Sequence, residues 1–128
     1  MRDYRNFFAG RFVEASASQR IEVRNPATGA VFTSVPAASE AEVRVAAEAA
    51  RAAQRAWRVL PAIERGNALR GLADALIAHA DAIGAALAAE SGKSLADATS
   101  EVVYGVELMR YHAEWARRIE GEVIESDN

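Results

Sequence analysis

Hydrophobic and polar residues alternate along the first 38 residues in a way that favours short strands. The segment 7–13 is apolar and aromatic around a glycine, which predicts a short strand or strand pair with a glycine turn. Residues 21–24 alternate apolar and polar side chains, as a half-buried strand does, and residues 30–35 form a second apolar run that ends at a proline. The five residues between these runs, 25–29, are turn formers, so the pattern predicts a β-hairpin.

From Ser39 onward the apolar residues recur at steps of three and four, which is the period of a helix. Ser39 and Glu42 form a capping box, in which the side chain of each bonds the backbone N–H of the other. Ser94 begins a second capping pair with Asp97, and Gly92 is a natural helix stop. A break is expected near residues 79–81. The pattern therefore predicts helices over 39–57, 61–79, 80–91 and 95–120.

These elements predict an α+β fold that is mostly helical, with an N-terminal β-hairpin followed by three or four helices. A chain of 128 residues is long enough for one domain. We divide it into a β-hairpin region over 1–38, a helical region over 39–121, and a segment over 122–128 that resembles the opening of a strand. Because no partner strand follows, this ending favours truncation of a longer protein.

Alanine supplies much of the 51% hydrophobic content, and this predicts a thin core. Alanine favours helix but buries little area, while apolar stabilisation grows at roughly 25 cal/mol per Å². The helix predicted over 95–120 also carries a second apolar face, formed by Tyr104, Leu108, Tyr111 and Trp115. A helix that is apolar on two sides needs neighbours on two sides. We therefore expect the chain to self-associate or to pack against a partner surface.

Composition excludes several classes of protein and of site. The net charge of -3 argues against a nucleic-acid-binding protein, and no apolar run is long enough to span a bilayer. The sequence contains no cysteine, so it has no disulfide, no thiolate metal site and no thiol nucleophile. We therefore expect a cytoplasmic protein that binds neither nucleic acid nor a membrane.

Candidate chemical motifs favour structural interpretations. Residues 92–94 read Gly-Lys-Ser, the end of a phosphate-binding P-loop, but that motif needs a glycine where Leu87 stands, and a helix precedes it in place of a strand. His79 and His112 each lack a helically spaced histidine or carboxylate of the H-E-x-x-H type. The aromatic face of the helix over 95–120 has the residues to line a ligand tunnel, yet spacing alone favours packing.

Five stretches, in this order, resemble the aldehyde dehydrogenase superfamily. They are an F-A-G-R-F-V opening, a V-R-N-P-A-T-G-A-V turn, an alanine-rich helix ending in tryptophan, an E-S-G-K loop and an R-Y-H-A-E-W-A helix end. Their order and spacing carry the resemblance over essentially the whole chain. Two further stretches, 60–65 and 113–122, look most like the lactaldehyde and glycolaldehyde dehydrogenases. The five stretches occupy 8–13, 23–31, 46–57, 90–93 and 110–116.

The resemblance implies an activity and a larger fold. Family members have an α/β fold and oxidise an aldehyde to a carboxylic acid with NAD or NADP. A cysteine thiolate attacks the aldehyde, hydride passes to the nicotinamide, and water aided by a glutamate releases the acid. The family's catalytic and cofactor-binding residues lie downstream of the part that this chain matches. The resemblance therefore implies no catalytic or cofactor-binding residue here, an inactive chain when alone, and no NAD or NADP bound by it.

A few secondary roles also follow from the resemblance. Tyr104 and Leu108 match positions on a helix that borders the aldehyde entrance tunnel. Glu90 matches a carboxylate that in some members helps to hold a structural monovalent cation, together with a backbone carbonyl near Val23. The segment 122–128 matches the start of the family's oligomerisation strands. The implied partners are the remainder of the dehydrogenase chain and further copies in a homo-oligomer.

Two other functions stay open beside this leading hypothesis of an N-terminal part of an aldehyde-oxidising dehydrogenase. A non-enzymatic helical interaction or oligomerisation module would explain the two-sided helix and the missing catalytic residues. A small stand-alone ligand binder would take up NAD or an aldehyde by itself, and we expect no such binding.

Overall fold

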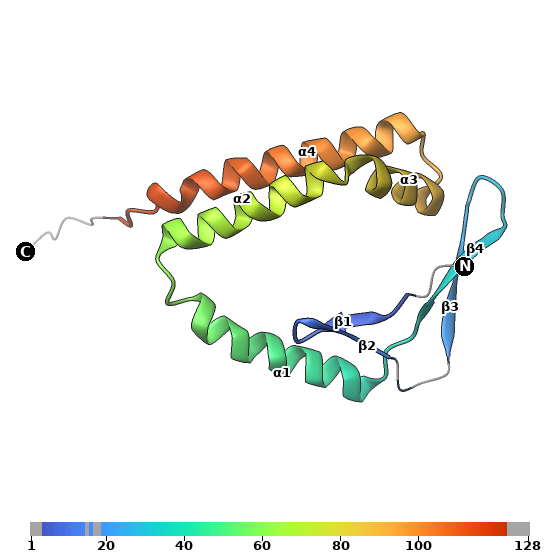
Figure 1. Ribbon diagram of the computed structural model, residues 1–128, viewed down its shortest axis with the longest axis horizontal. Coiled ribbons are helices and arrows are strands. Elements are labelled where there is room, and N and C mark those ends of the chain that lie inside the picture. The colour runs from blue at the N-terminus through green and yellow to red at the C-terminus, as the bar shows by residue number, and fades with distance from the viewer. Residues whose placement is uncertain (1–3, 15, 17–18, 123–128) are drawn as a thin grey trace, which may run out of the picture.

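The computed structural model describes residues 4–14, 16 and 19–122, and within them four short strands precede four α-helices (Figure 1). The predicted α+β class, mostly helical, is confirmed. Apart from Glu122, the segment predicted to open a strand over 122–128 lies outside the described residues. The elements are β1 (Asn6–Phe8), β2 (Arg11–Val13), β3 (Arg20–Arg24), β4 (Val31–Pro36), α1 (Glu40–Trp57), α2 (Ala62–Ala78), α3 (Ala80–Ser91), α4 (Leu95–Glu114) and a 3₁₀ turn (Trp115–Arg117).

The strands pair as two separate antiparallel hairpins. The β3–β4 hairpin confirms the predicted one, and β1–β2 shows that the segment 7–13, predicted as a short strand or a strand pair, belongs to a strand pair. In β1–β2 the rings of the opposed Phe7 and Phe12 meet edge to face at 5.0 Å between centroids. Ala9 and Gly10 form the turn between them with φ of 52° and 76°, the backbone pattern of a tight hairpin. In β3–β4 the register slips by one residue at Val23, which marks a bulge.

Local capping chemistry sets three of the helix boundaries. Ser39 caps α1 through the predicted capping box, and the Ser94 side chain accepts the backbone N–H of Asp97 at the start of α4. Gly92 ends α3 in the left-handed conformation with φ of 75°. The predicted break falls at His79, where α2 and α3 diverge by 73°. These ends are fixed by neighbours in sequence, which is why the sequence pattern predicts them.

The predicted helix over 95–120 is too long. α4 ends at Glu114 and tightens into the 3₁₀ turn Trp115–Arg117, where the Arg118 N–H donates to the Trp115 carbonyl at 2.9 Å. Helix ends commonly close their last carbonyls with such shorter hydrogen bonds. The apolar period continues through this turn, so periodicity alone places the helix end too late.

The core is thin and lies where α2 and α3 pack on α4. Its fully buried apolar side chains are small: Ala73 from α2 and Ala98, Val106 and Ala113 from α4. Small side chains allow the helix backbones to approach closely but bury little apolar area each. The prediction of a thin, alanine-rich core is therefore confirmed.

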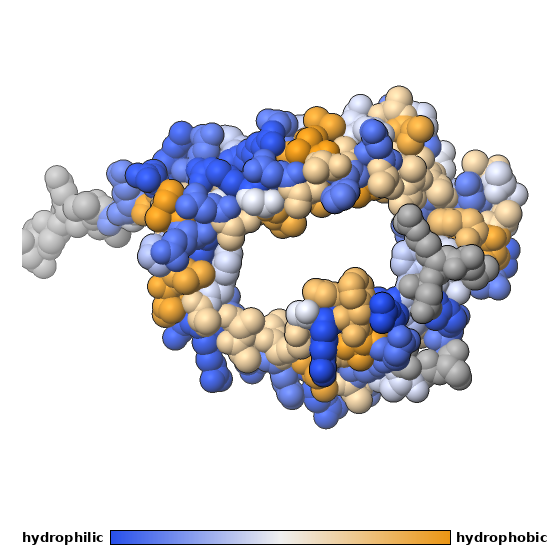
Figure 2. Space-filling view, in the orientation of Figure 1, coloured by the Kyte–Doolittle hydropathy of each residue, from blue (hydrophilic) through white to orange (hydrophobic). Residues whose placement is uncertain are grey.

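Around this core the elements form an open frame. Figure 1 shows α2, α3 and α4 along one side, α1 with the β1–β2 hairpin along the other, and β3–β4 closing one end. The space-filling view shows an opening through the middle (Figure 2). None of the α1 residues is buried. The chain exposes 9824 Å², where a compact monomer of its size exposes about 6,600 Å².

A hydrogen-bonded cluster around Glu42 holds the start of α1. The Ser39 N–H donates to Glu42 Oε2 at 2.7 Å, and the Ser16 N–H, from the loop after β2, donates to Glu42 Oε1 at 2.8 Å. These bonds, the one from Ser39 foremost, favour the charged carboxylate and lower the pKa of Glu42 to about 2. The cluster ties the loop between the two hairpins to helix α1.

Two glycine-to-alanine substitutions should change the free energy of unfolding in opposite directions, because α3 and α4 approach closely at Gly84 while Gly71 lies open. A Cβ at Gly84 would lie 2.5 Å from Thr99 Oγ1 and 3.0 Å from Thr99 Cα, so Gly84→Ala should destabilise the chain by about 1–3 kcal/mol. Gly71→Ala in α2 meets nothing within 4 Å and should stabilise it by about 0.5–1 kcal/mol. Urea unfolding followed by circular dichroism measures both. A stabilised Gly84→Ala chain contradicts the close crossing of α3 and α4.

The Glu42 cluster predicts a loss of stability in acid. Because folding lowers this pKa from 4.5 to about 2, the contribution of Glu42 is fully present above about pH 4.5 and is lost as the pH falls through about 2. Glu42→Gln should lower the urea midpoint at neutral pH and flatten its fall in acid. Glu48→Gln, which lacks such hydrogen bonds to the described residues, is the control. Parallel pH profiles for Glu42→Gln and the unchanged chain would count against the cluster.

Candidate functional site

The outer face of α4 is the first surface that the sequence singles out. Tyr104 is 65% exposed and Leu108 41% exposed, and Tyr111 and Trp115 continue the same face towards the helix end. The opposite side of α4 carries the buried Ala98 and Val106. The prediction that α4 is apolar on two sides is confirmed, and the described residues cover only one of them.

The Gly-Lys-Ser stretch serves as a helix boundary, as the sequence favours. Gly92 ends α3, and the ammonium group of Lys93 pairs with the carboxylate of Glu101 on α4. Ser94 caps α4 through the Asp97 N–H at 3.1 Å. This lysine and this hydroxyl group therefore contribute to the α3–α4 connection, not to a phosphate loop.

The same stretch forms the joint between the strands and the helices. A Cβ at Gly92 would lie only 2.7 Å from Cγ of Pro26, in the turn of the β3–β4 hairpin. The joint therefore brings together the Asn-Pro-Ala-Thr-Gly turn and the Glu-Ser-Gly-Lys loop, which are far apart in sequence. Glu90 lies exposed on the last turn of α3, and Val23 lies half-buried on β3.

The described residues contain no group of three or more histidine, cysteine, aspartate or glutamate side chains placed to hold a metal ion. His79 lies at the bend between α2 and α3, and His112 packs its ring against Tyr111 at 5.4 Å. One polar group near Val23 is unusual. The Thr33 side chain, which pairs across the sheet with Val23, is 7% exposed, and its hydroxyl has no hydrogen-bond partner among the described residues.

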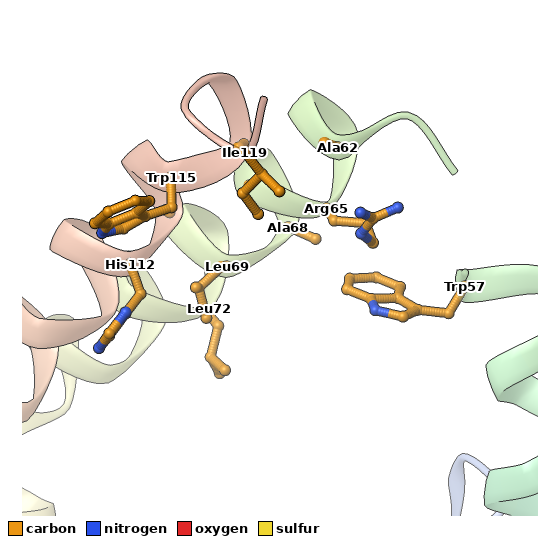
Figure 3. A pocket seen from close by; sticks show the side chains of 12 residues that line it. Trp57, Ala62, Arg65, Ala68, Leu69, Leu72, His112, Trp115 and Ile119 are labelled. Carbon is orange, nitrogen blue, oxygen red and sulfur yellow. The ribbon is translucent and has the colours of Figure 1, made fainter. Parts of the chain in front are cut away.

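A pocket of about 380 Å³ lies where the end of α1 faces the first half of α2 and the end of α4 (Figure 3). Trp57 of α1 lies opposite Leu69 and Leu72 of α2 (Figure 3). The 3₁₀ turn and the residues after it contribute Trp115 and Ile119. Both tryptophans of the chain therefore line one pocket.

The polar groups of this pocket are the side chains of Arg65 and His112 and the indole N–H groups of the two tryptophans, and its lining includes no carboxylate. The half-buried Arg65 donates from Nη1 to the carbonyl of Leu60 at 2.5 Å, which fixes the loop between α1 and α2. Sequence reasoning missed this pocket because Trp57, Leu72 and Trp115 belong to three different elements. The only signal in the sequence is that each tryptophan lies at the end of a helical pattern.

The described residues offer apolar surface and structural ion pairs more than reactive groups. Arg110 of α4 donates to Asp74 of α2 and to Glu107, each at 3.0 Å. The pairing with Asp74, more than that with Glu107, raises the pKa of Arg110 above its usual value. With the capping carboxylate of Glu42, this is the other clear pKa shift in the described part of the chain. Neither group lies in the pocket or on the outer face of α4.

Among the described residues, no single helix has the length and apolar composition needed to cross a membrane; α2 and α3 meet that test only as a pair bent by 73°.

Comparison with known proteins identifies clear relatives. Residues 12–128 match the model of the aldehyde dehydrogenase family. The chain is 43% identical to the glutarate-semialdehyde dehydrogenase of Pseudomonas aeruginosa, over 90% of this chain and 24% of that protein. It is 40% identical to the lactaldehyde dehydrogenase of Escherichia coli, over 94% of this chain and 25% of that protein. It is also 40% identical to an NADP-dependent glyceraldehyde-3-phosphate dehydrogenase of Streptococcus equinus, over 97% of this chain and 26% of that protein.

The fold matches as well as the sequence does. A crystal structure of the lactaldehyde dehydrogenase from Escherichia coli superimposes with a TM-score of 0.92 at 39% identity, covering 98% of this chain and 26% of that one. The relatives include the lactaldehyde dehydrogenase that the sequence motifs favour, beside dehydrogenases named for other aldehydes. The chain spans about a quarter of the length of the relatives it matches.

The joint at Gly92 predicts a coupled pair of substitutions. Gly92→Ala places a Cβ on a left-handed residue and against Pro26, and should cost about 1–3 kcal/mol of folding free energy. In a Pro26→Ala background the Cγ contact is gone, so Gly92→Ala should cost less. A double-mutant cycle by urea unfolding measures the difference. Additive effects of the two substitutions on the free energy of unfolding would show that Pro26 does not pack against Gly92.

Proposed function

Because this chain belongs to the aldehyde dehydrogenase family, we propose that it forms the N-terminal part of an enzyme that oxidises an aldehyde to a carboxylic acid with NAD or NADP. One observation carries the proposal. The whole open frame matches a solved dehydrogenase at a TM-score of 0.92 while covering 26% of that chain. An arm such as α1, with no buried residue, has little within the frame to hold it in this shape. In the relative, the other three quarters of the chain are present to hold it.

In this proposal the chain contributes support and shape, and the chemistry comes from the rest of the enzyme. The sequence holds no cysteine, so the thiolate that attacks the aldehyde comes from elsewhere. The surface in excess of a compact monomer, about 3,000 Å², is the area that the rest of the enzyme would cover. The chain alone is then inactive and binds no NAD or NADP.

The outer face of α4 is proposed to form part of the aldehyde entrance, with Tyr104 and Leu108 as lining residues. Their exposure and their spacing of one helical turn support this role, since both side chains stand on one unfilled face. A shallow depression that includes Tyr104, Ser100 and Val103 adjoins them.

Glu90 and the backbone near Val23 are proposed to hold a structural monovalent cation. Their two segments are brought together by the contact between Gly92 and Pro26. The buried hydroxyl of Thr33, opposite Val23, lacks a hydrogen-bond partner among the described residues. A buried polar group of this kind is often satisfied by a water molecule or an ion.

We further propose that the enzyme is a cytoplasmic homo-oligomer. The exposed apolar faces of α1 and α4 support burial by further protein. The alternative, a non-enzymatic helical interaction module, is supported by the same exposed faces, and it predicts stable self-association of the chain without any dehydrogenase domain.

A chimaera tests the proposed function. The quarter of the Escherichia coli lactaldehyde dehydrogenase that this chain matches is replaced by residues 1–128, and reduction of NAD or NADP with lactaldehyde is followed by absorbance. We expect activity from the chimaera, and none from the chain alone or from the relative without its matched quarter. A folded but inactive chimaera, with the isolated chain forming a stable oligomer in light scattering, would favour the interaction module instead.

A further inference from the structure

We propose that the pocket between α1, α2 and the end of α4 is a docking socket for a segment of the dehydrogenase remainder, and that this segment brings an aromatic or aliphatic side chain beside a carboxylate. The proposal rests on the proposed function, since that function supplies the remainder. It adds the place of contact and the chemistry of the partner segment.

The apolar half of the socket comes from large side chains that meet water in this chain. Trp57 is 44% exposed, Leu72 is 49% exposed and Ile119 is 76% exposed, and all three line the same pocket. Tryptophan and arginine are among the residues that most often dominate binding energy at interfaces, and this pocket gathers two tryptophans and Arg65. A volume of about 380 Å³ lies at the lower end of the range of small-molecule sites and is sufficient for side chains of a partner segment.

The charge of the socket favours the second chemical feature of the partner segment, which is a carboxylate. The lining includes the guanidinium of Arg65 and the ring of His112 but no aspartate or glutamate. Arg110 pairs with Asp74 and Arg118 pairs with Glu114, whereas Arg70 donates to the amide oxygen of Asn67. Arg65 instead has one hydrogen bond within the described residues, to the carbonyl of Leu60. A guanidinium at an apolar site binds a carboxylate strongly, through charge-assisted and often paired hydrogen bonds.

The exposed area favours a large partner over a second copy of the chain. A standard interface buries about 800 Å² on each partner. The excess of about 3,000 Å² would remain mostly uncovered after such a contact. Interfaces of this larger size are characteristic of permanent assemblies, as between parts of one folded enzyme.

Thiol labelling tests whether the socket is occupied. The sequence has no cysteine, so Leu72→Cys introduces one in the socket and Asp81→Cys, at an exposed polar position in the first turn of α3, one outside it. Each is labelled with iodoacetamide in the isolated chain and in the active chimaera, and the labelled peptide is quantified by mass spectrometry. Leu72→Cys should react on the order of tenfold more slowly in the chimaera, and Asp81→Cys equally in both.

Charge substitutions in the same chimaera test the partner's chemistry. Leu72→Asp should lower the unfolding temperature more than Leu72→Lys, because only the aspartate repels a carboxylate. Arg65→Gln should lower it more than Arg65→Lys, which keeps the positive charge.

An active chimaera in which Leu72→Cys reacts as fast as in the isolated chain overturns the socket while leaving the proposed function standing. If Leu72→Asp and Leu72→Lys lower the unfolding temperature equally, the proposed carboxylate of the partner segment is overturned. If Leu72→Cys in the isolated chain reacts more slowly as the concentration of the chain rises, a second copy occupies the socket, and the proposal is overturned. An inactive chimaera counts against the proposed function itself.

Discussion

The arrangement of the molecule follows from the contact of small side chains where α2 and α3 cross α4. Ala73, Ala98 and Ala113 are fully buried, and Gly84 lies so close to Thr99 that a methyl group would not fit. Such crossings bring backbones together but bury little apolar area. The helical layer is therefore close-packed and thin, and it leaves larger apolar side chains, including Trp57 and Tyr104, at the surface. Because the core is built from so few and such small side chains, the frame stays open and its large apolar side chains stay exposed.

Features decided by neighbours in sequence could be predicted, and features decided by distant parts of the chain could not. The capping box of Ser39 and Glu42 and the left-handed end at Gly92 need only local chemistry, and both are confirmed. The end of α4 at Glu114 was missed because the apolar period runs on through the 3₁₀ turn. The pocket around Trp57 was missed because periodicity finds an apolar face without showing which element lies opposite. The apolar face of Tyr104 and Leu108 was predicted, whereas its part in an entrance tunnel stays a proposal.

The resemblance to the family has a physical counterpart in the joint at Gly92. Two of the motifs that carry it, the turn at 25–29 and the loop at 90–93, touch through Pro26 and Gly92. A proline fixes the turn backbone, and a glycine gives the helix end both its positive φ and the space for that proline. Each motif is a weak signal in the sequence, and together they form one contact that connects the strands to the helices. The frame that contains this contact matches a dehydrogenase about four times as long with a TM-score of 0.92.

We propose that α1, beyond the hydrogen bonds that hold its start at Glu42, is kept in place by protein outside the 128 residues and not by the frame itself. Hydrogen exchange of backbone amides, compared between the isolated chain and the chimaera, tests this most directly. We expect the amides of α1 to exchange rapidly in the isolated chain while those around Val106 in α4 are protected, and both helices to be protected in the chimaera. Protection of α1 equal to that of α4 in the monomeric isolated chain would contradict it.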